Sequence, residues 1–323
     1  MKSGLKKLVI CILLLSGLSL FIHARPALDR SLTIYGIRGP SGMAMIKLFE
    51  EPPRIQGFNV KVEALAHADL VAARFIAGEA LIGILPPNVA ARIAASGIHI
   101  QVAAVIGMGM ISLLTSESQI QSIDDLRGKT VELAGQGVTP DYVFRRLLLA
   151  RGLRPETDVR LAYALGPPEI TQSLITGRIS TALLPEPFAT IALSGRPDLR
   201  SVEDIQDEWR RITGGDNYPM TVLAVNGDFA AQNPQALRII LERFADSIKW
   251  TVENPAEAGN LAFAHDLGFP QAAAALAIPR SNYVFIPAVE ARSALEDLFK
   301  VFLEFNPASI GNVLPSNRFY LDW

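Results

Sequence analysis

The residue types best suited to covalent or metal chemistry are few and scattered in this chain. The four histidines are far apart, and no His-Glu-x-x-His pattern occurs that would place two imidazoles on one helix face for a metal ion. Ser41 stands in Pro-Ser-Gly, not in the Gly-x-Ser-x-Gly elbow of a lipase-type nucleophile. The sequence therefore predicts neither a metal site nor a catalytic serine.

Nucleotide and redox cofactors also lack a recognisable motif. The chain has no Gly-x-x-x-x-Gly-Lys-[Ser/Thr] loop. Gly107-Met108-Gly109 lacks the third glycine of a dinucleotide-binding fingerprint and precedes a predicted strand where the motif requires a helix. Carboxylates are common, but none forms a recognisable acid–base pair. We expect no cofactor and no catalytic residue, and we expect that the protein is not an enzyme.

What remains is a set of loops that end predicted strands and open predicted helices. Such loops direct unpaired backbone N–H groups at a ligand, and their glycines permit close approach of the backbone. Any one loop is better explained by ordinary helix capping, but several in matching places of two halves favour a ligand cleft. The residues predicted to bind the ligand are Arg38, Ser41, Gly42, Asn88, Gly135, Gln136, Gly137, Thr139, Glu186, Asn217 and Tyr218.

The side chains of this set leave two ligand chemistries open. Arg38, its one cation, can pair with a sulfonate or carboxylate if it faces the cleft, or it can be a solvated surface arginine. Glu186, if buried, suits an amine or a heterocycle N–H, but a carboxylate at a helix N-terminus is also favourable without a ligand. Tyr218 can stack on a ring or pack in a hinge. The small number of charges favours a small, weakly charged organic ligand.

The elements that must position these residues alternate between strand and helix along the chain. Gly- and Pro-rich turns join them, which indicates an α/β fold with a mostly parallel sheet. Strands are expected at 31–37, 59–64, 81–85, 100–106, 111–115, 130–133, 159–163, 182–184 and 221–225. Helices are expected at 43–49, 69–77, 89–95, 141–150, 168–175, 189–193, from 234 onward, and at 291–305.

The pattern repeats within the chain. Residues 81–88 (a strand, then Pro-Pro-Asn, then a helix) resemble residues 182–188 (a strand, then Pro-Glu-Pro-Phe, then a helix). The glycine-rich turn after the first strand likewise resembles residues 135–139. Two similar halves that face one another create a cleft, and α/β sheets bind ligands at the carboxyl ends of their strands.

The N-terminus has the layout of a secretory signal peptide. Three lysines precede an apolar run from Leu8 to Ile22, and the small residue Ala24 suits cleavage. The alternative is a retained anchor, although the run falls short of the ~20 residues that span a bilayer. Cys11, the single cysteine, lies inside this run, so cleavage leaves no thiol for a disulfide or a metal. We expect residues 1–24 to be a signal peptide and the mature chain to be exported to the periplasm.

The charge of the chain argues against nucleic acid as a partner. The formal net charge is −2, or −5 without the three lysines that precede Leu8, and there is no basic block. A chain of 323 residues is long enough for about two domains and for a core that needs no disulfides.

Several segments, taken in order, resemble one family. Residues 122–131 (SIDDLRGKTV) are similar to the segment that opens the second lobe of many periplasmic substrate-binding proteins. Residues 78–85 resemble a strand of these proteins, with Leu81 where they usually carry Asp. Residues 185–189 (PEPFA) resemble the Glu-Pro turn of the SsuA/THI5-like, or NMT1-like, group, which binds nitrate, sulfonates and thiamine precursors. Asn233-Pro234 and residues 253–258 resemble its C-terminal helical region.

This resemblance implies a two-lobed type II periplasmic-binding-protein fold without catalytic activity. Lobe 1 would comprise residues 31–115 and 222–323, and lobe 2 residues 116–221, with crossings near Thr115-Ser116 and Pro219-Met220. The implied function is delivery of a sulfonate, a pyrimidine or thiamine precursor, or a related heterocycle to an ABC importer. The implied partners are the permease and ATPase subunits, and the protein itself would be a monomer.

Two other functions stay open. One is an enzyme on the same fold that acts on a small metabolite, which the export signal disfavours because such enzymes work in the cytosol. The other is an exported ligand sensor for a membrane receptor. A permease and an ATPase encoded next to this chain would distinguish the importer from the sensor.

The export segment gives the first prediction. The mature protein should begin near Arg25 and be recovered in the periplasm, because the apolar run is short and the small residue Ala24 follows it. N-terminal sequencing of the fractionated product checks this. Intact Met1 on a product bound to the inner membrane would contradict it.

Overall fold

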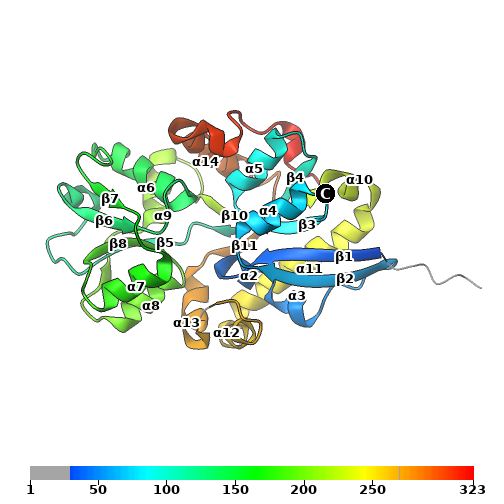
Figure 1. Cartoon of the computed structure of the whole chain (residues 1–323), viewed down its shortest axis with the longest axis horizontal. Coiled ribbons are helices and arrows are strands. Elements are labelled where there is room, and N and C mark those ends of the chain that lie inside the picture. The colour runs from blue at the N-terminus through cyan, green and yellow to red at the C-terminus, as the bar shows by residue number, and fades with distance from the viewer. Residues whose placement is uncertain (1–29, 269) are drawn as a thin grey trace, which may run out of the picture.

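The computed structural model describes residues 30–268 and 270–323, which form two α/β lobes side by side (Figure 1). We define lobe 1 as the part built on a six-stranded sheet and lobe 2 as the part built on a five-stranded sheet. The expected signal peptide, with its cleavage site at Ala24, lies outside the described residues. Among the helices that the structure describes, none combines the length and the apolar character needed to cross a membrane.

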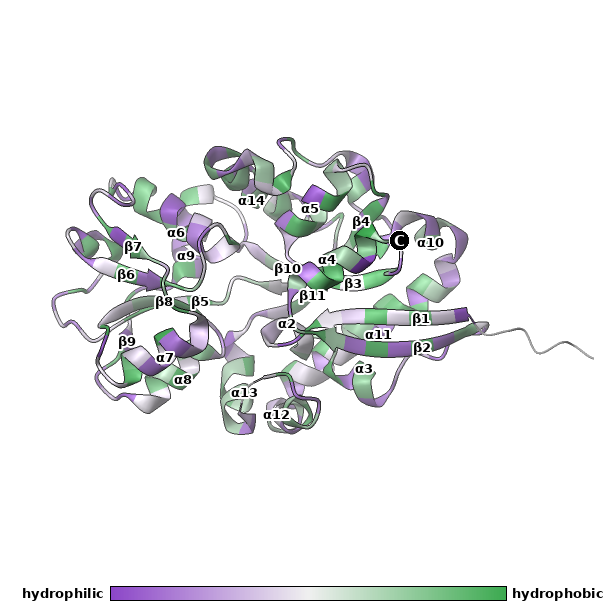
Figure 2. Cartoon of the chain, in the orientation of Figure 1, coloured by the Kyte–Doolittle hydropathy of each residue, from purple (hydrophilic) through white to green (hydrophobic). Residues whose placement is uncertain are grey.

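The sheet of lobe 1 has the order β11-β4-β10-β3-β1-β2. Its strands are β1 (Arg30–Ile37), β2 (Phe58–Leu65), β3 (Ile82–Leu85), β4 (Ile100–Met108), β10 (Pro219–Asn226) and β11 (Tyr283–Pro287). β1 pairs in parallel with β2 and β3, whereas β10 runs antiparallel to β3 and β4, and β11 antiparallel to β4. The inner strands are buried on both faces and read as continuous hydrophobic runs, as Figure 2 shows for β3 and β4.

Helices on both faces of this sheet supply the core of lobe 1. They are α2 (Pro40–Met43), α3 (Ile46–Glu50), α4 (Ala68–Ile76), α5 (Pro87–Ala95), α10 (Gly227–Gln232), α11 (Pro234–Glu253), α12 (Pro255–Ala264), α13 (Gln271–Ala277) and α14 (Arg292–Phe305). Short 3₁₀ turns span Ile278–Arg280, Pro307–Ile310 and Asn317–Phe319. The apolar stripe of α11, from Leu237 to Ile248, is buried against this sheet, as its helical spacing predicts.

Lobe 2 repeats the arrangement with a smaller sheet of order β7-β6-β8-β5-β9. The strands are β5 (Ile111–Thr115), β6 (Thr130–Leu133), β7 (Arg160–Ala162), β8 (Thr181–Pro185) and β9 (Arg200–Ser201). A 3₁₀ turn at Ile123–Leu126 and helices α6 (Thr139–Ala150), α7 (Pro167–Ile175), α8 (Phe188–Gly195) and α9 (Ile205–Thr213) cover it. β6 is parallel to β7 and β8, and β5 is antiparallel to β8 and β9.

Two expectations about the sheets need correction. The sheets are mixed, not mostly parallel, and the strand at 111–115, expected in lobe 1, pairs within the sheet of lobe 2. The cause is the direction of the crossing. β4 runs toward lobe 2, so the chain that continues from it enters lobe 2 heading away from lobe 1, opposite to β6 and β8. By the same reasoning, β10 re-enters lobe 1 antiparallel to β3 and β4.

The chain thus crosses first at Gly109-Met110, not near Thr115-Ser116, and returns at Asn217-Tyr218, just before the expected second crossing. The two crossings are hydrogen-bonded to each other, since the Asn217 side-chain amide donates to the Gly109 carbonyl at 3.3 Å. Asn282, which precedes β11, donates to the same carbonyl. Tyr218 is fully buried, packs edge-on against the Trp209 ring and hydrogen-bonds to Gln206. The crossings therefore form one packed junction.

Gly109 gives a test of this junction. A Cβ at position 109 would lie 2.3 Å from Cζ of Tyr218 and 2.5 Å from Oδ1 of Asn217, so Gly109→Ala should destabilise the protein by about 1–3 kcal/mol through overpacking. Gly107→Ala is the matched control, because a Cβ there has its nearest neighbours at 3.5 Å. Denaturant unfolding of both variants checks the prediction, and equal losses would contradict it.

Candidate ligand-binding cleft

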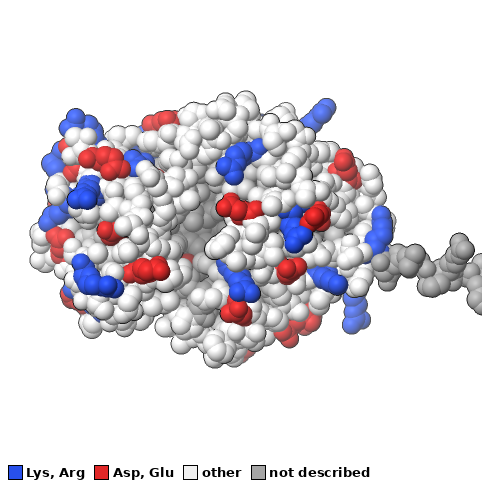
Figure 3. Space-filling model, in the orientation of Figure 1, with Lys and Arg blue, Asp and Glu red and all other residues white. Residues whose placement is uncertain are grey.

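The carboxyl ends of the parallel strands of both lobes meet at the hollow between the lobes (Figures 1 and 3). From lobe 1 come the loops after β1, β2 and β3, which open α2, α4 and α5. From lobe 2 come the loops after β6, β7 and β8, which open α6, α7 and α8. The first-turn N–H groups of a helix have no partner within the helix, so this arrangement points several donors toward one space. The candidate loops predicted from the sequence are among those that border this hollow.

Arg38 follows β1 but is not a free cation. Its guanidinium forms an ion pair of 3.1 Å with Asp266, and the two side chains are 50% and 79% exposed. The backbone holds the same two segments together, because Gly39 N–H donates to the Leu267 carbonyl at 2.7 Å. Such an exposed pair contributes about 0–1 kcal/mol to stability. The charge of Arg38 is balanced within lobe 1.

Ser41, Gly42 and Asn88 lie at the first turns of α2 and α5. The Ser41 hydroxyl is 3.5 Å from that of Thr221 on β10. Gly42 is buried against β1, and a Cβ there would lie 2.8 Å from the Ile37 carbonyl oxygen. Glycine at position 42 therefore serves the packing of α2 on β1. Asn88 is half-buried in the first turn of α5.

The loop from Gly135 to Thr139 joins β6 to α6. Gly135 and Gly137 have φ of 98° and 76°, values that favour glycine. The Gly137 N–H donates to the Asp141 carboxylate at 2.8 Å, so this donor is already used within the protein. Gln136 is exposed at the tip of the loop, and Thr139 is buried where α6 begins.

Glu186 directly follows β8 and is only 2% exposed. One carboxylate oxygen accepts a hydrogen bond of 3.1 Å from the Thr190 N–H in the first turn of α8. Burial raises the pKa of Glu186 despite this hydrogen bond and the charge of Arg280 on lobe 1. Next to it, Pro187 shares a small space of about 10 Å³ with Met43, Ser281 and Tyr283. Glu186 therefore stands at the contact of the two lobes.

Asn217 and Tyr218 belong to the crossing segments. The side-chain oxygen Oδ1 of Asn217 accepts from the Tyr218 N–H at 2.9 Å, and its side-chain NH2 group donates to the Gly109 carbonyl. The Tyr218 side chain has no exposed surface, since it packs against Trp209. It cannot offer a stacking face to a ligand, and its role is the packing of the junction.

Some residues at the cleft escaped the sequence reasoning. Tyr283 of β11 is buried and donates to the Pro40 carbonyl at 2.9 Å, and burial raises the pKa of its phenol. The Thr190 hydroxyl is buried with no hydrogen-bond partner among the described residues. Neither stands in a turn motif, and β11 was not expected as a strand. Two signals were available: the run of strand-forming residues at Tyr283–Pro287, and a polar residue one helical turn after Glu186.

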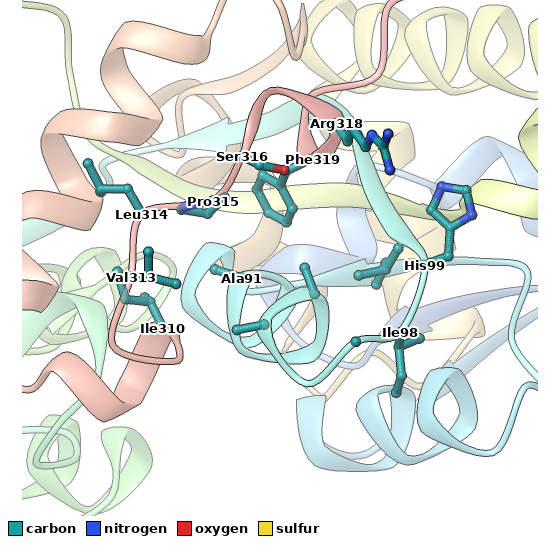
Figure 4. Close-up of a pocket in the computed structure, with 14 residues that line it drawn as sticks. Ala91, Ile98, His99, Ile310, Val313, Leu314, Pro315, Ser316, Arg318 and Phe319 are labelled. Carbon is teal, nitrogen blue, oxygen red and sulfur yellow. The ribbon is translucent and has the colours of Figure 1, made fainter.

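A larger cavity, of about 520 Å³, lies elsewhere on lobe 1 (Figure 4). α5 and the segment after α14 line it, mostly with apolar side chains such as Ile98, Val313 and Phe319, and His99 and Arg318 lie toward one end. None of the predicted ligand-binding residues borders it. Within residues 30–268 and 270–323, no cluster of three or more His, Cys, Asp or Glu side chains is placed to hold a metal ion.

Comparisons with known proteins agree with this architecture. A crystal structure of an ABC transporter from Parabacteroides distasonis is 26% identical, with a TM-score of 0.78 over 91% of this chain and 99% of that one. The periplasmic aliphatic sulphonate binding protein SsuA from Escherichia coli is 16% identical, with a TM-score of 0.72 over 91% and 92% of the two chains. The periplasmic nitrate-binding protein NrtA from Synechocystis is 13% identical, with a TM-score of 0.52 over 72% and 65%.

The two lower identities establish the fold alone, which is the two-lobed type II periplasmic-binding-protein fold. A search of curated proteins found no match. The model of the NMT1-like family matches residues 65–264, which span the loops after β2, β3, β6, β7 and β8 and both crossings. The chain belongs to the NMT1-like family.

Proposed function

We propose that this protein is the exported solute-binding component of an ABC importer, without catalytic activity, and that it delivers a small organic molecule to the permease. The arrangement of two lobes around a cleft, joined by two crossings that are hydrogen-bonded to each other, supports this most directly. Residues 30–108 with 219–323, and residues 111–217, are the two bodies that close on the ligand. The likeness to an ABC transporter from Parabacteroides distasonis over nearly the full length of both chains adds to the proposal.

The charges at the cleft favour a ligand that donates N–H groups, such as an amine or a nitrogen heterocycle. Arg38 is paired with Asp266, and the charge of Arg280 acts on Glu186, so both arginines named at the cleft already face a carboxylate. Glu186 is a buried carboxylate whose described partner is one backbone N–H. A buried carboxylate with so few donors is costly, and a ligand donor would offset that cost. We therefore favour a pyrimidine-like heterocycle over a sulfonate or nitrate.

A ligand panel tests this proposal. The protein without its signal segment is mixed with 4-aminopyrimidine, ethanesulfonate or nitrate, and its thermal unfolding is followed. A compound at a hundredfold excess over its Kd should stabilise the fold by about 2.7 kcal/mol. We expect 4-aminopyrimidine to raise the Tm and to reduce the radius of gyration in small-angle scattering, because the lobes close by small backbone changes at the crossings.

Two results would count against the proposal. A rise in Tm with ethanesulfonate or nitrate alone would show that the site takes anions. A strong shift with a metal ion or an oligosaccharide, and none with any small organic compound, would contradict the small-molecule cleft itself. An unchanged radius at saturating ligand would contradict lobe closure.

The raised pKa of Glu186 predicts a pH-dependent effect of one substitution. The folded state holds this proton more tightly than the unfolded chain does. The contribution of Glu186 to stability is therefore fully present below its unfolded pKa and is lost as the pH rises through the folded pKa. Glu186→Gln, whose carbonyl can still accept from Thr190, should leave the Tm near that of the wild type at about pH 4 and raise it at about pH 8.

Glu169→Gln is the control for this experiment. Glu169 also lies in the first turn of a helix, α7, at the same edge of the sheet, but it is exposed. Its substitution should not produce a gain that grows with pH. The prediction fails if the two substitutions change the Tm in parallel across the pH range.

In the same samples, Glu186→Gln should weaken binding of 4-aminopyrimidine about tenfold or more, as expected for loss of a charged hydrogen bond.

A further inference from the structure

Asp141, in the first turn of α6, is a buried carboxylate that the ligand argument does not use. It is 1% exposed, and three donors reach it. Its Oδ2 accepts from the Gly137 N–H at 2.8 Å, and its Oδ1 accepts from the Tyr163 hydroxyl and from Nε of Arg145, both at 2.7 Å. Arg145 supplies the countercharge that a buried carboxylate requires.

The donors come from two different loops of the cleft. Gly137 lies in the loop after β6, whereas Tyr163 is the first residue of the loop after β7. Arg145 connects these groups further, because it also donates to the Tyr163 hydroxyl at 2.6 Å and to the Glu156 carboxylate at 2.8 Å. Hydrogen bonds to an ionised group are shorter and stronger than neutral ones. One carboxylate therefore ties together two loops whose backbones carry no sheet hydrogen bonds beyond the strand ends.

An ordinary helix cap would not account for this geometry. A carboxylate at the third position of a helix usually reaches back to the N-cap residue, here Val138. Asp141 instead reaches Gly137, one residue further, and at the same time a side chain from another loop. The arrangement fixes where Gly135 to Val138 stand relative to Tyr163.

We infer that Asp141 is a positioning residue that holds the two loops of lobe 2 in the geometry required for ligand binding. This inference rests on the proposed function, since it assigns the loops after β6 and β7 to that same cleft. Asp141 acts through the loops and does not itself touch the ligand.

The experiment measures amide hydrogen exchange of the ligand-free protein. Asp141→Asn should accelerate exchange in both 134–138 and 163–166 roughly tenfold or more. Its NH2 group places a donor against the donor of one loop, and its single uncharged oxygen holds the other loop less strongly than the carboxylate does. Tyr163→Phe keeps the ring beside Arg145 but removes the hydroxyl, so it should accelerate exchange in 163–166 while 134–138 stays protected.

Asp158→Asn is the matched control. Asp158 likewise accepts a backbone N–H at 2.8 Å, from Arg154, and pairs with Arg154 and Arg127, but it precedes β7 and lies at the opposite edge of the sheet. It should leave both cleft loops unchanged. In binding assays with 4-aminopyrimidine, Asp141→Asn should raise Kd at least tenfold, and Asp158→Asn should not change it.

If Asp141→Asn exchanges faster in 134–138 alone, Asp141 acts only as a cap of its own helix, and the inference is overturned. Faster exchange throughout lobe 2 would also overturn it, because it would show loss of the fold. If 4-aminopyrimidine binds neither wild type nor variants, the proposed ligand class fails, while the exchange pattern still decides whether Asp141 joins the loops.

Discussion

The close packing of the two chain crossings around Gly109 is the constraint on which the two-lobed arrangement depends. The Gly109 carbonyl accepts hydrogen bonds from Asn217 and Asn282, and the missing side chain leaves the space that Tyr218 fills. These residues come from the first crossing, the second crossing and the start of β11. Three distant parts of the sequence are thus held at one point. A second contact between the lobes lies at α6 and α14, where Tyr142 packs against Phe302 and Phe305.

The direction in which the chain passes this junction decides which edges of the sheets face one another. β4 approaches it and β5 leaves it, so β5 must run opposite to the strands β6 and β8 of its own sheet. The carboxyl ends of β1 and β3 then face those of β6, β7 and β8. The cleft therefore follows from the reversal at Gly109, and the loops that line it follow from the strand ends.

Much of this could be predicted from the sequence because the signals were local. The buried strands β3 and β4 read as apolar runs, and prolines at the starts of α5, α6 and α7 mark where helices open. The two-residue β9 carries no such run. β11 does carry one, in YVFIP, but it is short and follows a long helical stretch, and no strand was expected there. The direction of β5 relative to its neighbours could not be predicted either. The sequence suggested that the chain crosses to lobe 2 after β5, whereas the structure shows the crossing before β5. Of the two roles left open for Tyr218, the structure shows packing at the junction. The sequence could not decide between them because the burial of Tyr218 depends on Trp209 and Gln206, which only the tertiary structure brings to it.

Comparison of the two buried carboxylates of lobe 2 shows why their roles differ. Asp141 accepts hydrogen bonds from a backbone N–H, a phenol and a guanidinium, so its charge is balanced within the protein. Its removal would disturb the loops around it. Glu186 is equally buried and accepts a hydrogen bond from one backbone N–H, and burial raises its pKa because Thr190 and the charge of Arg280 do not offset the loss of hydration. A carboxylate in that state lowers the stability of the ligand-free protein, which is the pattern expected where function outweighs stability. The buried Thr190 hydroxyl, also without a partner among the described residues, lies one helical turn away. Under the proposed function, both groups would gain hydrogen bonds from a ligand that carries its own donors and acceptors.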